Sequence, residues 1–496
     1  MKSPVCISSR YRYHALVQML LSFGLLVLLS LINLNFSVPI SLPHADAVLL
    51  LSSHPLTVQS PQGPTMNDSH LKAEVVFKGI RFPTSMAFLG PNDILVLEKN
   101  EGTVRRIVNG SMLQQPLLRV NVANDGERGL LGIAVSKARS SSNNDITTYV
   151  FLYYTESGQR KSDNISGVTQ PAAGNRLYRY ELVDNKLVNP KLLLDLPATP
   201  GPYHNGGKVV IGPDNNVYVV IGDVFSHRTK AQNFVNGSEP DGTSGILRIT
   251  QDGKVVSSSN SGANGILGNN FLLNLYYAYG IRNSFGMDFE PLTGRLWDTE
   301  NGPAYGDEIN LVQPGFNSGW EAIQGNWRPV SKHLDIYAGS AVINPNNLVT
   351  FNGKGKYRSP EFIWYQPTGP TAIKFLNSTK LGKQYQDDMF VADFHHGNIY
   401  HFKLNQNRTG LILNGPLAGK VADSINDLKG VVFGHGFGGI TDMQVGPDGY
   451  LYVLSLYEGG NSCAAVLHVN TPCISYTSSI QGTIFRIVPI NTTFVR

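Results

Sequence analysis

The chain has 496 residues, of which 42% are hydrophobic and 15% charged, and its formal net charge is +4. This length allows one large domain or two to three ordinary ones. The small net charge, without a cluster of Lys and Arg, argues against a nucleic-acid-binding protein. The 51 glycines and the sparse charged residues favour short strands and turns over amphipathic helices.

Residues 1–48 have the pattern of a targeting segment. Lys2, Arg10 and Arg12 precede an apolar run over residues 16–34, and a stretch of small residues follows. This order is typical of a signal peptide. The run is nearly long enough to span a bilayer, so an uncleaved N-terminal anchor is the alternative. We therefore expect a secreted or extracytoplasmic protein that either loses this segment or stays anchored by it.

Residues 49–70 are polar and rich in Pro, Ser and Gln, and we interpret them as a linker. Of the three cysteines, Cys6 lies in the targeting segment. Cys463 and Cys473 flank a polar stretch and could form a disulfide in an oxidising compartment. Two free thiols are the alternative.

Residues 71–496 repeat one pattern: an apolar strand, a turn, a second strand, a polar turn and a third strand. The six copies begin near Pro83, Gly129, Gly206, Tyr279, Thr371 and Ile440. Repeats of three to four strands with turns between them predict an all-β fold, a six-bladed β-propeller. We expect residues 73–77 to pair beside the last blade and close the ring.

The fourth copy contains the stretch with the most chemistry, YGIRNSFGMDFEPLTGRLWDTENGPAYGDEINLVQPGFNSGW, at residues 279–320. A loop dense in Arg, Asn, Glu, Gly and Pro between apolar strands is where a scaffold usually carries a functional site. This stretch resembles the soluble glucose/sorbosone (aldose sugar) dehydrogenases that depend on pyrroloquinoline quinone (PQQ). A weaker resemblance extends from Phe82 to Pro489.

The resemblance implies a six-bladed propeller with its site at one mouth of the central channel. It implies oxidation of an aldose at the anomeric carbon to the lactone, with PQQ and Ca²⁺ as cofactors. The partners would be a small sugar and an external electron acceptor whose identity the sequence does not give.

His204 lies in a glycine- and asparagine-rich loop at residues 201–207. Imidazole has an ordinary pKa near 6.5, so it can be a neutral base at working pH. The resemblance implies that His204 is the catalytic base; from the residues alone, a loop histidine that bonds the backbone is the alternative. Tyr203 stands where some family members carry an acidic partner, so another group must set the His204 tautomer.

Arg282 and Asn283 place a guanidinium and an amide side by side, which suits a planar anionic ligand. The resemblance implies that this pair contacts the quinone; an ordinary surface turn is the alternative. Glu127 falls where the family places a polar side chain near the substrate.

Gly302 and Pro303 can present two carbonyls in a fixed direction, because proline restricts the residue before it. Carbonyl oxygens suit Ca²⁺. The resemblance implies that this pair binds the cation that holds the cofactor; a plain turn is the alternative. It also implies a second, structural Ca²⁺ site at Glu308 and the main-chain carbonyl of Ser318, for which a solvated glutamate is the alternative.

The sequence departs from the family where PQQ carboxylates are bound. Three carboxylates need cationic partners, and some members supply a Lys in the fifth blade and an Arg-x-Arg pair in the last. Here His395 replaces the Lys, and Gly439 and Thr441 replace the arginines. We expect His395 to bind the cofactor. The other cations considered are His396, His435 and Lys374.

Two other functions fit the same residues. One is a non-catalytic, Ca²⁺-stabilised propeller that binds a glycan or a protein, which the missing cations favour. The other is a Ca²⁺-dependent hydrolase such as a lactonase, with His204 as base. Ligation by carbonyls alone at Gly302 and Pro303 argues against a catalytic metal and hence against the hydrolase.

Overall fold

The computed structural model describes residues 63–139, 145–158, 171–225, 227–256, 265–325, 345–457 and 481–490. The chain divides into Met1–Val58, which lies outside these ranges, and a compact unit, Gln59–Arg496. The predicted targeting segment and all three cysteines therefore lie outside the described residues. Within the described ranges, no helix is long and apolar enough to cross a membrane.

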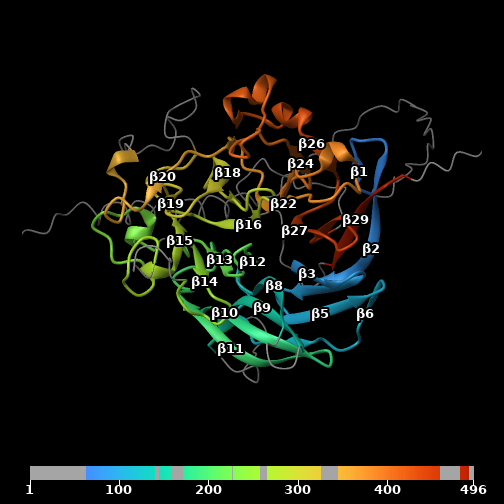
Figure 1. The fold of residues 1–496 in the computed structure, drawn as a ribbon, viewed down its shortest axis with the longest axis horizontal. Helices are drawn as coiled ribbons and strands as arrows, with labels where there is room; N and C mark the ends of the chain where they lie inside the picture. Colours follow the sequence, from blue (N-terminus) through green and yellow to red (C-terminus); the bar gives the residue numbers. More distant parts are fainter. Residues whose placement is uncertain are drawn as a thin grey trace, which may run out of the picture. The chain divides into compact units, whose positions relative to one another are not determined.

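The strands of the described residues form six hydrogen-bonded sheets (Figure 1). The first contains β3 (Pro83–Gly90), β4 (Asp93–Glu98), β5 (Thr103–Val108), β6 (Ser111–Met112) and β7 (Leu118–Arg119). The second contains β8 (Leu130–Arg139), β9 (Ile146–Ser157), β10 (Ala172–Val183) and β11 (Lys186–Leu196). The third contains β12 (Val209–Ile211), β13 (Val217–Ile221), β14 (Gly245–Ile249), β15 (Tyr276–Tyr279), β19 (Phe316–Asn317) and β20 (Lys356–Tyr357).

The other three sheets follow in chain order. The fourth contains β16 (Ser284–Phe289), β17 (Leu296–Glu300), β18 (Asp307–Val312), β21 (Phe362–Trp364) and β25 (Val421–Ala422). The fifth contains β22 (Pro370–Phe375), β23 (Met389–Asp393), β24 (Ile399–Phe402), β26 (Val432–His435) and β1 (Thr65–Met66). The sixth contains β27 (Ile440–Val445), β28 (Leu451–Ser455), β29 (Gln481–Pro489) and β2 (Leu71–Arg81).

The first strands of the six sheets contact one another in turn: β3 with β8, β8 with β12, β12 with β16, β16 with β22, β22 with β27, and β27 with β3. This closed circuit is a β-propeller, and the prediction of an all-β propeller is confirmed. In the described ranges, the helical elements are short 3-10 turns. Thr65 of β1 pairs with His435, so the end of the segment interpreted as a linker adds a strand to the fifth sheet.

The sixth sheet is completed by a strand from near the start of the domain. β2 pairs antiparallel with β29, with Ala73 opposite Ile487 and Val75 opposite Phe485, as predicted for residues 73–77. Figure 1 shows β2 in blue beside β29 in red. This pairing leaves no open edge between the two strands and holds the ring closed.

In each sheet the first two strands form a hairpin, which we call the inner hairpin, and turn residues set where its chain direction reverses. At the β12–β13 turn, Asn215 adopts a left-handed φ of 61° and its amide donates to the Gly212 carbonyl. Asn is among the few residues that tolerate this conformation. In the third sheet, the second strand β13 reads VYVVI and every one of its residues is buried, as expected for a strand covered on both faces.

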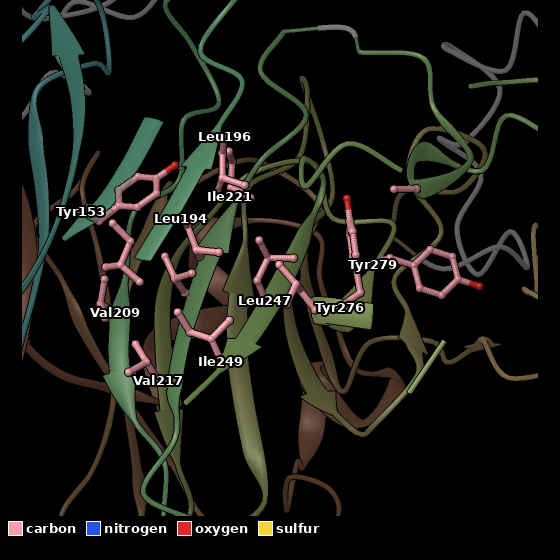
Figure 2. Packing of buried hydrophobic residues seen from close by; sticks show 14 of the residues in the cluster. Tyr153, Leu194, Leu196, Val209, Val217, Ile221, Leu247, Ile249, Tyr276 and Tyr279 are labelled. Carbon is pink, nitrogen blue, oxygen red and sulfur yellow. The ribbon is translucent and has the colours of Figure 1, made fainter. Parts of the chain in front are cut away.

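The hydrophobic core lies between neighbouring sheets. Figure 2 shows the cluster between the second and third sheets, where Tyr153 and Leu194 pack with Val209, Leu247 and their neighbours. Tyr153 is fully buried, and its hydroxyl donates to the backbone carbonyl of Asn205 at 3.0 Å. The core thus fixes the loop that carries His204.

Candidate functional site

The predicted site residues lie in the loops that precede the inner strands of several sheets. Glu127 precedes β8, His204 precedes β12 and Asn283 precedes β16. The Glu127 carboxylate accepts from the His204 backbone amide at 2.7 Å and from the Asn283 side-chain amide at 3.0 Å. Three predicted residues from three sheets are therefore hydrogen-bonded together. We call this end of the inner strands the site end.

His204 is 9% exposed, and its Nδ1 lies 2.6 Å from Oδ1 of Asp223. Burial opposes ionisation of Asp223, but hydrogen bonds from His204 and Trp320 hold the pKa of its carboxyl group below the ordinary value. An ionised Asp223 keeps a proton on Nδ1 and leaves the Nε2 lone pair available. No described residue hydrogen-bonds to Nε2, so this nitrogen can take a proton from a bound molecule.

Asp223 is a residue that the sequence reasoning missed. Tyr203, where an acidic partner was sought, is 41% exposed, and Asp223 provides the partner instead. The pairing of β12 with β13 could have identified it: Val209 opposes Val219, so residues just after β13 lie beside residues just before β12. Trp320 was also missed; its indole N–H donates to Oδ2 of Asp223 at 2.8 Å.

Arg282 and Asn283 lie between the His204 loop and residues 300–301. The Asn283 carbonyl accepts from the Asn301 amide at 2.7 Å. The Arg282 guanidinium donates to the Asn301 carbonyl at 2.9 Å and lies over the Trp320 ring, 5.4 Å from its centroid. Burial lowers the pKa of Arg282, an effect opposed by the nearby carboxylates, so the group stays charged. Its buried Nε has no hydrogen-bond partner among the described residues.

Four buried acids lie behind this pair, on or beside β17 and β18: Asp298, Glu300, Asp307 and Glu308. Burial raises the pKa of each, to about 7 for Glu300. The Ser318 hydroxyl donates to Glu300 at 2.6 Å and lies 3.4 Å from Glu308. Glu308 and Ser318 are thus close together, but the contact uses the Ser318 side chain, whereas the sequence interpretation used its carbonyl.

Gly302 is buried beside these acids, and Pro303 is exposed. The Gly302 amide donates to Oδ1 of Asp307 at 2.8 Å. A Cβ on Gly302 would lie 2.0 Å from the Tyr305 carbonyl oxygen, so only glycine fits here. The remaining oxygen of Asp307 accepts from the Thr368 and Gly369 amides, each at 2.8 Å.

His395 is exposed at the far side of the same network. Its amide donates to the Thr368 carbonyl at 3.1 Å, and its Nδ1 lies 3.3 Å from the Pro367 carbonyl. The backbone therefore links His395 to Gly302 through Asp307. Burial lowers the pKa of the neighbouring His396, which favours its neutral form.

Two of the other cations considered do not reach this network. Lys374 lies near the end of β22 away from the site, where it pairs with Asp288 at 2.8 Å. Strand direction explains the error, because β22 begins at the site end and Lys374 is its second-to-last residue. His435 lies on β26, near the outer edge of the fifth sheet, opposite Thr65.

The residues present fit a hard divalent cation. Four buried carboxyl groups face few cationic side chains, and oxygen donors are what Ca²⁺ prefers. Among the described residues, no group of three or more His, Cys, Asp or Glu side chains has the geometry of a metal site. The carbonyls of Gly302 and Pro303 would hold such a cation, and a bound cation would favour the ionised form of the acids behind them. The unpartnered Arg282 Nε and the adjacent Asn283 fit an anionic group on a planar cofactor.

Comparisons with known proteins identify the family. The sequence model of the glucose/sorbosone dehydrogenase family matches residues 80–464. The chain is 25% identical over 407 residues to the aldose sugar dehydrogenase YliI of Escherichia coli, covering 79% of this chain and 91% of the relative. It is 29% identical over 270 residues to quinoprotein glucose dehydrogenase B of Acinetobacter calcoaceticus, covering about half of each chain (51% and 52%).

Among solved structures, the apo form of the soluble aldose sugar dehydrogenase from Escherichia coli superposes with a TM-score of 0.58. Its sequence is 22% identical, and the match covers 85% of this chain and 100% of that one. This likeness shows the shared fold. The family match covers most of the propeller, including every predicted site residue, and the protein therefore belongs to the glucose/sorbosone dehydrogenase family.

Proposed function

We propose that the protein oxidises an aldose sugar at its anomeric carbon to the lactone, with PQQ and Ca²⁺ as cofactors and an external electron acceptor. The observation that carries this proposal is the His204–Asp223 pair, which leaves Nε2 available at a mouth where Arg282 is half-buried. The relative named as a quinoprotein supports the cofactor. A relative named as an aldose sugar dehydrogenase supports the substrate class.

In the proposed reaction, His204, Asp223 and Glu127 have different roles. Oxidation removes two electrons and two protons from the aldose as the C1=O bond forms. His204 Nε2 takes the proton of the anomeric hydroxyl, and the Asp223 carboxylate stabilises the imidazolium that results. When bound, PQQ supplies the acceptor for the hydride that leaves the anomeric carbon. Glu127 keeps its carboxylate at the mouth, where it fixes the His204 backbone and can accept from sugar hydroxyls.

The cofactor-holding residues would be Arg282 and Asn283 on one side and His395 on the other. The carbonyls of Gly302 and Pro303 would hold Ca²⁺, and Glu308 with Ser318 would hold a second, structural ion. Ionisation of the buried acids would accompany binding of the cations, and Arg282 would favour the anionic cofactor.

We also infer that the propeller has six blades. Each of the six sheets in the described residues contributes one inner strand, and these strands contact one another in sequence around the ring. The β2–β29 pairing completes the sixth blade.

The test uses the full-length protein purified without cofactor and then supplied with Ca²⁺ and PQQ. Dye reduction is followed with a panel of aldoses. We expect saturable, sugar-dependent reduction in the wild type and a loss of about 10²- to 10⁴-fold in kcat for His204→Ala, the range typical of a general base.

His70→Ala is the matched control. His70 also has its Nδ1 against an aspartate, Asp68 at 3.0 Å, but it is exposed and precedes β2, at the opposite end of the sixth sheet. A folded, Ca²⁺-loaded protein that binds no PQQ by calorimetry and oxidises no aldose would reject the proposal. The preferred hypothesis would then be a non-catalytic propeller that binds a glycan or a protein.

A further inference from the structure

We infer that Tyr203 and Phe225 form a second sugar subsite beside His204, which binds the pyranose ring linked to the aldose undergoing oxidation. The preferred substrate would then be a disaccharide or longer oligosaccharide with a free reducing end. This inference rests on the proposed function and specifies its substrate class. We call the two side chains the aromatic ledge.

Both rings of the ledge are exposed although they are large and apolar. Tyr203 is 41% exposed and Phe225 is 52% exposed. Their ring centroids lie 5.9 Å apart at an interplanar angle of 57°. Phe225 also lies 5.9 Å from the His204 ring. Adjacent exposed aromatic side chains at the mouth of a polar site are a signature of ligand binding.

The backbone holds Phe225 in this position at an energetic cost. Val224 and Phe225 have left-handed φ values of 47° and 59°. This conformation is a genuine outlier for a β-branched or bulky residue, and such strain concentrates at functional sites. The Phe225 amide donates to Oδ1 of Asp223 at 2.9 Å, and the Val224 amide donates to the His204 carbonyl at 3.3 Å. The segment that supplies the partner of His204 therefore also presents Phe225 to solvent.

Two glycines make room for the rings. A Cβ on Gly201 would lie 2.5 Å from Cβ of Phe225, and a Cβ on Gly126 would lie 3.2 Å from the Tyr203 ring. Gly126 is followed by Glu127, whose carboxylate belongs to the His204 network. The ledge is therefore continuous with the candidate site, with an apolar surface next to an acceptor for hydroxyl groups.

The chemistry of this surface matches a neutral sugar ring. A pyranose presents C–H groups on its faces and hydroxyls at its rim, so it can stack on an aromatic ring while its rim reaches polar groups. Aromatic faces carry partial negative charge, which disfavours the carboxylates of PQQ at this place. The ledge lies beside the imidazole, so a stacked ring would be a neighbour of the aldose whose anomeric carbon meets Nε2.

The test compares glucose with cellobiose on the full-length protein loaded with Ca²⁺ and PQQ. We expect Phe225→Ala and Tyr203→Ala to lower kcat/KM for cellobiose by roughly five- to ten-fold each, mainly through KM, as loss of one ring contact predicts. For glucose, kcat/KM should change by less than about two-fold. Leu292→Ala is the control, since Leu292 is 64% exposed and lies in the β16–β17 turn, away from the site end.

An equal loss on both sugars would overturn the subsite, because it would show a general effect on the His204 loop. If the wild type binds no PQQ and oxidises no aldose of the panel, the proposed function fails, and saturation-transfer NMR with cellobiose still tests the ledge. Signal from the non-reducing ring that disappears in Phe225→Ala supports the subsite. Absence of that signal in the wild type overturns it.

Discussion

The two ends of the inner strands differ in the contacts that their charged side chains make. At the site end, Glu127 accepts from the backbone or side-chain amides of other sheets, and buried acids lie beside half-buried Arg282. At the opposite end, the strand ends line a cavity of about 670 Å³, in which Asp288 pairs directly with Lys374. The same strands thus end in a network of amide-to-carboxylate hydrogen bonds beside buried acids on one side, and in an open cavity with a Lys–Asp ion pair on the other.

Backbone conformation follows the same division. His204, Val224 and Phe225 at the site end have left-handed φ values. At the opposite end, the left-handed positions of the inner turns are filled by Asn215 and Gly449, which adopt them at little cost. Left-handed bulky residues therefore lie at the site end, near the buried acids, whereas Asn and Gly take the left-handed positions of these two inner turns.

The largest expected effect is on catalysis, from removing the charge that orients His204. Asp223→Asn should lower kcat by about 10²- to 10³-fold, because the amide can no longer favour the Nδ1–H tautomer or stabilise the imidazolium. Steady-state dye reduction across pH 5–9 measures this loss. Asp448→Asn is its counterpart at the opposite end, where the carboxylate accepts from the Tyr452 hydroxyl at 2.8 Å. Comparable losses in the two variants would remove the distinction between the ends.

The next prediction compares two variants that should lose similar stability but differ in their loss of activity. Glu127→Ala leaves the His204 amide and the Asn283 side chain without their acceptor, which should cost about 1–3 kcal/mol of unfolding free energy. Asp288→Ala is the matched change, since Asp288 accepts from the Phe375 amide at 3.0 Å and from Lys374. Urea unfolding should show similar losses for both variants. Only Glu127→Ala should also lower kcat/KM; equal activity losses would contradict the assignment of Glu127.

The smallest expected effect is a pH-dependent response to calcium. Burial raises the pKa of Glu300 from 4.5 to about 7. Without metal, the folded state holds a proton that the unfolded state releases near pH 4.5, so stability falls as pH rises through this window. A bound cation favours the carboxylate, so Ca²⁺ should stabilise the protein more at pH 8 than at pH 5, by about 1–2 kcal/mol.

Thermal unfolding with Ca²⁺ or EDTA at the two pH values measures this difference. Glu300→Gln should flatten the pH dependence of the calcium effect, because the amide does not titrate. Asp288→Ala should retain it. A calcium effect that is the same at both pH values in the wild type would show that the buried acids do not sense the ion.

Much of the fold was predictable because its signals are local. The four-residue stretches GPDN (212–215) and GPDG (446–449) are typical of hairpin turns. The apolar runs beside them form β12, β13, β27 and β28. The closing pair β2–β29 was predictable because closing the ring needs a strand from one terminus in the sheet of the other. His204, Arg282 and Gly302 were found through their motifs, and the structure places all three at the site end.

The missed and misplaced residues depend on register and strand direction. Asp223 lies 19 residues beyond His204, and only the pairing of β12 with β13 brings them together. The Glu127–Asn283 contact joins positions 156 residues apart, for which no local pattern exists. Lys374 is close to the site in sequence but lies at the other end of its strand. Such contacts become visible only when the sheets are assembled.

The closure of the sixth sheet has a consequence for biosynthesis. Glu74 on β2 forms an ion pair with Arg486 on β29, 412 residues later in the chain. The ribosome therefore releases almost the whole polypeptide before β2 meets its partner, and contacts so distant in sequence form slowly. Any product truncated before residue 481 lacks β29 entirely and exposes the edges of β2 and β28. Such a chain is therefore expected to be more prone to aggregation than the complete one, because unpaired strand edges can pair with other chains.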